Sequence, residues 1–256
     1  MSRFVNAGAG LLIALAAAGC SSGDGTTAPA GSGHVVFQLA TAQQGSTAGP
    51  ATAAVTVTVG TDVIVITDVQ LVARRIRLEQ TIGDCAPDAP STSEGTGNEQ
   101  SEEAADTPRC PEIKVGPFLL APPLTEGTQT AFTADLPAGT YRKLHLLIWK
   151  PSQIAEDEAF RTAHPEFATI SIKVTGTFNG TAFTFTSDLQ AKEDITFPSP
   201  VDVAEGATTT VTLLMDVKGW FLGLEGGALL NPSALDAGNK ALVEANIKNS
   251  FAAFGN

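Results

Sequence analysis

The stretch DVIVITDVQLVARRIRL, residues Asp62–Leu78, is the most informative about the fold in this chain of 256 residues. It is rich in Val and Ile, which favour strands over helices. Apolar and polar side chains alternate along it, but the parity of the apolar positions slips between Ala73 and Ile76. Such a slip moves the following side chains to the other face of a strand and is typical of a bulge. The stretch therefore predicts one long strand with a bulge or bend.

Shorter stretches on both sides of this strand show the same alternation. It occurs in Val55–Val59, in Tyr141–Trp149 with Leu144, Leu146 and Ile148 on one face, and in Thr209–Val217 with Val211, Leu213, Met215 and Val217 on one face. Turns rich in proline and glycine separate the stretches. Many short strands with such turns are typical of two packed antiparallel sheets. The predicted fold is mainly β, an antiparallel β-sandwich of the immunoglobulin-like or prealbumin-like kind.

The segment Ala168–Leu189 predicts a β-hairpin with a defined register. Asn179–Gly180 is the strongest two-residue turn signal, because both positions of a type I′ turn need a positive φ. With that turn fixed, the pairs on one apolar face are Phe178 with Thr181, Gly176 with Phe183, Val174 with Phe185, and Ile170 with Leu189. The other face is polar, so we expect one face to pack on the core and the other to meet water.

Two helices are expected. The first is a short helix within Glu156–Phe167, near residues 156–164, which ends close to Pro165. The second is a C-terminal helix over Asn239–Phe254, with Asn239 as its N-cap. Its apolar stripe consists of Val243, Ile247, Phe251 and Phe254. We expect this stripe to dock on an open end or edge of the sandwich.

The N-terminus is typical of an exported protein. Arg3 precedes a short apolar run, and the small residues 17–19 come directly before Cys20. This layout resembles the lipobox of bacterial lipoproteins, in which the cysteine is acylated, for example with palmitate, and becomes the first mature residue. Ser21 and Ser22 then favour sorting to the outer membrane by the same resemblance. The alternative is an ordinary cleaved signal peptide with an incidental Cys20.

The expected domain organisation follows from these segments. It comprises a signal peptide at 1–19, a flexible tether at 20–33, a β-sandwich domain at 34–230 and a C-terminal helical segment at 231–256 that packs on the domain. The tether is predicted from its Gly, Ser, Thr, Ala and Pro composition. The lipid on Cys20 would hold the protein stably on a membrane.

The chain is acidic, with 15 Lys and Arg against 27 Asp and Glu and a net charge of −12. Such a surface disfavours nucleic acid, which needs neutralising cations. Six of the 27 acidic residues lie in residues 86–109, a stretch without hydrophobic periodicity that we interpret as a disordered insertion. Cys85 and Cys110 flank it and are predicted to form a disulfide outside the cytosol. A calcium loop is the alternative, although the carboxylates lack the 1-3-5 spacing of such loops.

Several stretches together resemble an uncharacterised family of bacterial exported lipoproteins with a β-sandwich domain. They are ITDVQLVARRIRLEQ, LPAGTYRKLHLLIWKP, VTGTFNGTAF, DVKGWF and NIKNSFAAF, which cover most of the chain after the tether. The resemblance implies an exported sandwich of unknown role and carries over no catalytic or binding residue. Tyr141, which follows Gly139 in the second stretch, is expected to pin a turn in the manner of a tyrosine corner.

The sequence offers no catalytic motif, so we expect a non-catalytic protein without cofactor or metal. His34, His145 and His164 lack the spacing of zinc ligands, and His145 is expected on a strand surface. Trp149 and Trp220 are the candidate ligand-contact aromatics, because an exposed ring can stack on a sugar or anchor a protein. The alternative places Trp149 under the insertion and Trp220 at one end of the core. The expected function is structural or protein-binding, with an envelope protein or glycan as partner, and carbohydrate binding is the second hypothesis.

Overall fold

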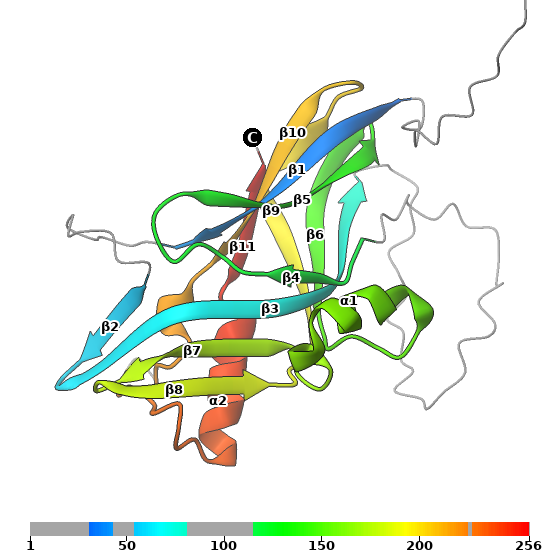
Figure 1. Ribbon diagram of the computed structural model, residues 1–256. Helices are drawn as coiled ribbons and strands as arrows, with labels where there is room; N and C mark the ends of the chain where they lie inside the picture. Colours follow the sequence, from blue (N-terminus) through cyan, green and yellow to red (C-terminus); the bar gives the residue numbers. More distant parts are fainter. Residues whose placement is uncertain (1–30, 43–53, 81–114, 225–226, 256) are drawn as a thin grey trace, which may run out of the picture.

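The computed structural model describes residues 31–42, 54–80, 115–224 and 227–255 (Figure 1). The strands are β1 (Ser32–Thr41), β2 (Val55–Val59), β3 (Asp62–Gln80), β4 (Phe118–Leu120), β5 (Thr128–Pro137), β6 (Gly139–Ile148), β7 (Ile172–Phe178), β8 (Thr181–Ser187), β9 (Ala191–Val203), β10 (Thr208–Met215) and β11 (Phe251–Gly255). The helices are α1 (Glu158–Ala163) and α2 (Ala237–Lys248), with single 3₁₀ turns η1 (Ala155–Asp157), η2 (Pro165–Phe167) and η3 (Val217–Gly219). In these residues no helix is long and apolar enough to cross a membrane.

The strands form two sheets, as the mainly β prediction requires. One sheet has the order β11-β10-β1-β5, in which β1 and β10 are parallel and the other pairs are antiparallel. The other is antiparallel, with the order β8-β7-β3-β6-β9, and β2 and β4 also pair with β3. Because β1 begins at Ser32, the first strand starts two residues before the expected start of the domain at residue 34.

The long strand β3 connects the two parts of the larger sheet. It pairs with β7 over Ile64–Leu71 and with β6 over Ala73–Gln80. Its register shifts between Ala73 and Arg75, which confirms the predicted bulge, and also between Ile66 and Asp68, where none was predicted. Figure 1 shows β3 running along β7 and then turning to run beside β6. The two bulges therefore let one strand serve two differently oriented halves of a sheet.

The core is continuous across both halves, but different elements cover each. The four-stranded sheet contributes buried side chains that include Val35, Leu136 and Val211. The segment around η3 and the helix α2 also contribute to this core, with Trp220, Phe221, Val243 and Ile247. The Phe221 ring meets Phe183 and Phe185 of β8 edge-on, with centroid distances of 5.7 and 5.4 Å. This fold is thus a sandwich in which a helix replaces the second sheet under the β7–β8 hairpin.

The β7–β8 hairpin confirms the predicted turn and most of the predicted register. Asn179 and Gly180 have φ of 48° and 80°, and Val174 faces Phe185 as expected. The ladder ends at Ile172 and Ser187, so the predicted pairing of Ile170 with Leu189 does not form. Ile170 instead packs against a small separate cluster of Val72, Phe160 and Phe167, which α1 and η2 place on β3.

The helix expected near 156–164 is present as η1, α1 and η2, whereas the C-terminal helix is shorter than predicted. It ends at Lys248, and Phe251 and Phe254 belong to strand β11, which pairs with β10. Its N-cap is Asp236, whose Oδ1 accepts from the Asn239 amide at 2.7 Å, so the assignment of the cap to Asn239 was wrong. The helical spacing of the two phenylalanines was coincidental, because the unpaired edge of β10 offers them backbone partners that a helix cannot.

Candidate binding surface

The outward face of β3, β6 and β9 gathers charged side chains in three cross-strand rows. The rows are Arg75–Leu147–Lys192, Arg77–His145–Asp194 and Glu79–Lys143–Thr196. The neighbouring residues Ile76, Leu78, Leu144 and Leu146 point the other way and are buried. We call these nine outward residues the charged grid. Four of them are Lys or Arg and two are carboxylates, so the grid is locally basic in an acidic chain.

His145 lies at the centre of the charged grid between two carboxylates. Its Nδ1 is 2.5 Å from Asp194 Oδ1, and its Nε2 is 3.0 Å from Glu79 Oε2. Lys143 Nζ approaches the other oxygen of Glu79 at 3.6 Å. A protonated imidazole donates from both nitrogens at once, whereas a neutral ring has one donor. His145 thus bridges Glu79 of β3 and Asp194 of β9 across β6.

The surroundings of β9 shift the pKa values of two carboxyl groups in opposite directions. Burial raises the pKa of Asp194, but the hydrogen bond from His145 and the charges of His145, Lys192 and Lys143 lower it more, and the pKa lies below its usual value. Glu193 pairs with Leu146 on the core side. Burial raises the pKa of Glu193, Lys248 lowers it and Asp194 raises it, and the net shift is upward.

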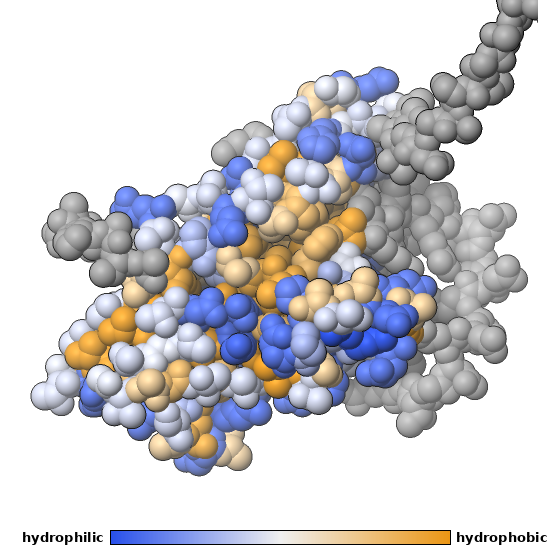
Figure 2. Space-filling view, viewed as in Figure 1, coloured by the Kyte–Doolittle hydropathy of each residue, from blue (hydrophilic) through white to orange (hydrophobic). Residues whose placement is uncertain are grey.

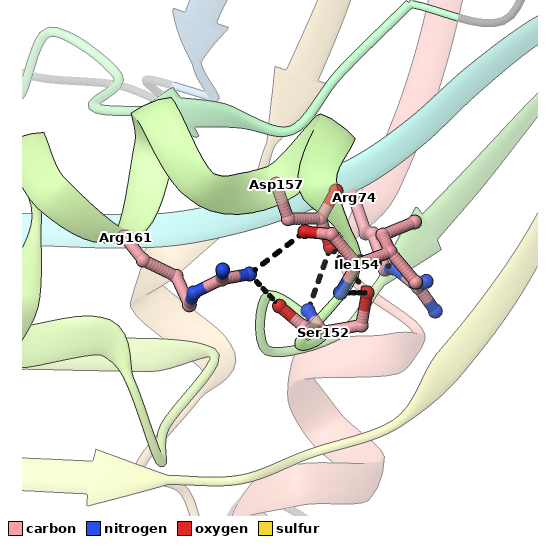
Figure 3. A network of polar contacts seen from close by, with 5 residues as sticks. All are labelled: Arg74, Ser152, Ile154, Asp157 and Arg161. Carbon is pink, nitrogen blue, oxygen red and sulfur yellow. Dashed lines mark hydrogen bonds and ion pairs between the residues drawn. The ribbon is translucent and has the colours of Figure 1, made fainter.

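A second polar network borders the grid and fixes the chain after β6. The Asp157 carboxylate is buried and accepts from the Ser152 amide at 2.6 Å and the Ser152 hydroxyl at 2.8 Å, with Arg74 Nε at 3.4 Å (Figure 3). Arg161 of α1 donates to the carbonyl oxygens of Ser152 and Ile154. The ion pair between Arg74 of β3 and Asp157 joins this network to the sheet, so the network holds α1 on β3.

The structure separates the two tryptophans singled out as candidate ligand contacts. Trp220 has 0 % of its surface exposed and lies in the core, so it cannot present its ring to a sugar. Trp149 follows the last residue of β6, donates its backbone N–H to the Val72 carbonyl at 3.3 Å and is partly exposed. The other candidate residues, Cys20, Cys85 and Cys110, lie outside the described residues, as does the insertion at 86–109.

The three histidines do not come together. His34 contacts Asp135 at 2.9 Å on the smaller sheet, and His164 lies 3.9 Å from Glu166 next to α1. In the described ranges, no group of three His, Cys, Asp or Glu side chains is placed to hold a metal ion. His145 points outward as its parity predicts, but only 12 % of its side chain is exposed. Its two carboxylate partners could not be predicted from the sequence, because their proximity depends on the strand order β3-β6-β9.

The surface seen in Figure 2 differs between the two ends of the larger sheet. Hydrophilic residues gather over α1, and hydrophobic ones lie along β2 and the adjoining part of β3. Val57 and Val59 of β2 are partly buried and pack on the core. On this face the hydrophilic residues therefore lie toward the α1 end of the larger sheet.

Comparison of the chain with protein-family models, with curated proteins and with solved structures finds no match.

Proposed function

We propose that the chain is an exported, lipid-anchored, non-catalytic β-sandwich of the bacterial cell envelope, held at the outer membrane, which acts by binding an envelope protein. The proposal is supported by the N-terminal sequence and the stretches quoted above, which resemble those of exported β-sandwich lipoproteins. The observation that most directly supports a lipid anchor is the short spacing between Cys20 and β1. Residues 21–31 alone separate an acylatable cysteine from a strand at the centre of the smaller sheet.

The anchor is tested by metabolic labelling with a fatty-acid analogue. The wild-type chain should incorporate label and sediment with the outer-membrane fraction, and Cys20→Ala should lose both properties. Cys85→Ala is the matched control, because it removes a cysteine that the proposal does not acylate. Equal incorporation into wild type and Cys20→Ala would overturn the anchor.

The charged grid is the surface that we assign to partner binding. Arg75 and Lys192 are exposed on its outer row, and the partly exposed Leu147 lies between them. An apolar centre between long cationic side chains fits an acidic partner with a small hydrophobic contact. Neither the rigid scaffold of three paired strands nor the His145 cluster needs to move when such a partner binds.

A photo-reactive residue tests this surface in intact cells. Placed at Arg75, it should form an adduct with one partner, and placed at the exposed Gln129 on β5 it should not. Lys192→Glu should remove the Arg75 adduct without changing the thermal stability. An equal adduct from both positions, or an adduct unaffected by Lys192→Glu, would exclude the grid as the contact surface.

Carbohydrate binding is the second candidate, and it rests on Trp149 alone now that Trp220 is known to be buried. The ring of Trp149 is partly exposed at the end of β6, where Lys143 and His145 precede it on the same strand. A partly exposed aromatic ring can stack on the apolar face of a sugar. A glycan array with wild type and Trp149→Ala decides this hypothesis, because only stacking on Trp149 would make the signal depend on that ring.

A further inference from the structure

The edge strand β8 carries unpaired backbone groups. In the described part of the chain it pairs only with β7, in a hairpin closed by a two-residue turn. In such a hairpin the residues flanking the turn exchange both hydrogen bonds, and the pattern then alternates along the strand. The backbone groups that point away from β7 therefore belong to Ala182, Thr184 and Thr186. All three residues are exposed, so the N–H and C=O groups of this edge are open to a partner.

Unlike the other long edge strands, β8 has no feature that prevents pairing. Proteins commonly protect open edges with charges, prolines or short strands. Strand β9 carries Pro198, Pro200 and charged residues, and β5 carries Asp135 and Pro137. Strands β2 and β11 are five residues each. The sequence of β8, TAFTFTS, has no charge, no proline and no glycine over seven residues.

We infer that β8 pairs antiparallel with β8 of a second copy of this chain, about a two-fold axis at Thr184. In this register Thr184 faces Thr184 of the second copy, and Ala182 faces Thr186. Each outward N–H then meets a carbonyl of the other copy, so all the open groups are satisfied by an isologous contact. No charged residue stands opposite another, and the strand is complementary to itself.

The core side of β8 supports the same pairing. Phe183 and Phe185 lie under the sheet against Phe221. In the proposed register Phe183 comes beside Phe185 of the second copy, which extends the apolar face across the axis. The net charge of −12 opposes association of two copies, and salt screens this repulsion. The dimer should therefore strengthen as the salt concentration rises.

Cysteine cross-linking on the full chain in detergent micelles tests the register. Cα atoms of a hydrogen-bonded antiparallel pair lie about 5.5 Å apart, within the range that a disulfide spans. Thr184→Cys should give a covalent dimer on mild oxidation, in a yield that rises with salt. Thr175→Cys is the matched control, because Thr175 faces Thr184 one strand further into the same sheet. It should give no more dimer than the wild type with its own cysteines.

A charge variant tests the interface without new cysteines. Thr184→Lys places two ammonium groups opposite each other at the axis and should weaken dimerisation about tenfold by sedimentation, since like charges directly opposite destabilise a strand pair. Thr175→Lys adds the same charge and should leave the dimer intact, and the melting temperatures of both variants report folding. A wild type that stays monomeric at high salt, or a dimer that survives Thr184→Lys, would overturn the inference.

Discussion

The Tyr141 hydroxyl donates a 2.8 Å hydrogen bond to the carbonyl oxygen of Pro137, four residues earlier in the chain. Tyr141 is fully buried, although Lys143 and His145 on the same strand parity point outward. A register shift between Tyr141 and Lys143 turns the tyrosine inward, where Gln80 Nε2 donates to its oxygen at 3.1 Å. The tyrosine thus closes the corner between β5 and β6, as its place after Gly139 predicts.

Tyr141→Phe should destabilise the fold while preserving its shape. The substitution removes the donor to the Pro137 carbonyl and leaves the Gln80 amide with only its longer bond to the Ala138 carbonyl at 3.4 Å, and a buried unsatisfied group costs about 1–3 kcal/mol. Urea unfolding at neutral pH measures the loss. Thr140→Val is the control, because it removes a hydrogen bond to the Asp202 side chain at the surface and should change stability by less than about 0.5 kcal/mol. Equal effects of the two variants would contradict the buried corner.

Tyr141 should also make stability fall at alkaline pH. Burial raises the pKa of Tyr141, the hydrogen bond from Gln80 lowers it, and the net pKa lies above its ordinary value of 10.0. The unfolded chain therefore loses this proton first, so the stabilising contribution is complete below about pH 10 and is lost as the pH rises through the folded pKa. Because the chain has a single tyrosine, ultraviolet titration reports this group alone. Tyr141→Phe should flatten the decline in stability above pH 10, and an unchanged decline would assign it to other groups.

How far the sequence predicts this structure depends on whether a feature is local. The Asn179–Gly180 turn, the inward Leu144 and Leu146, and the bulge after Ala73 follow from patterns within a few residues. The partners of His145 and the parallel pairing of β1 with β10 depend on which strands become neighbours, and periodicity carries no such information. At the C-terminus the helical spacing predicted a helix through Phe254, and pairing with the edge of β10 instead makes a strand from Phe251.

Gly176 should be intolerant of any side chain. A Cβ built on it would lie 2.0 Å from the carbonyl oxygen of Val65, where β7 pairs with β3 next to the bulge between Ile66 and Asp68. Backbone atoms cannot rotate away as a flexible side chain can, so Gly176→Ala should separate the two strands and cost more than about 3 kcal/mol. Gly219→Ala is the control, because no atom lies within 4 Å of its Cβ position. The two melting temperatures compare them, and similar values would contradict the close contact.

Cys85 and Cys110 should form a disulfide, so removing either cysteine should lower the stability by the same amount. The chain leaves β3 at Gln80 and returns at Val115, whose carbonyl accepts from the Ile76 amide at 3.2 Å. Each cysteine is five residues from one of these two ends. Closing a loop of this length stabilises by roughly 3 kcal/mol.

The single variants and the double variant test this pairing. Cys85→Ser, Cys110→Ser and both together should cost the same, because either change removes the whole bridge. A non-reduced digest should show the two flanking peptides joined in one mass. Costs that add in the double variant, or two free thiols in freshly purified protein, would exclude the disulfide.

Substitutions before and after Lys248, where the helix ends, should differ in how much they lower the free energy of unfolding. Ile247 is fully buried in α2, and Ile247→Ala should cost about 2–5 kcal/mol through lost burial and the cavity it leaves. Phe254 is 37 % exposed on β11, so Phe254→Ala should cost less than about 1 kcal/mol despite the larger side chain. A continuous helix over both positions would place them on one buried stripe and reverse this order. Urea unfolding of the two variants therefore distinguishes a helix followed by an edge strand from the single amphipathic helix that the sequence favoured.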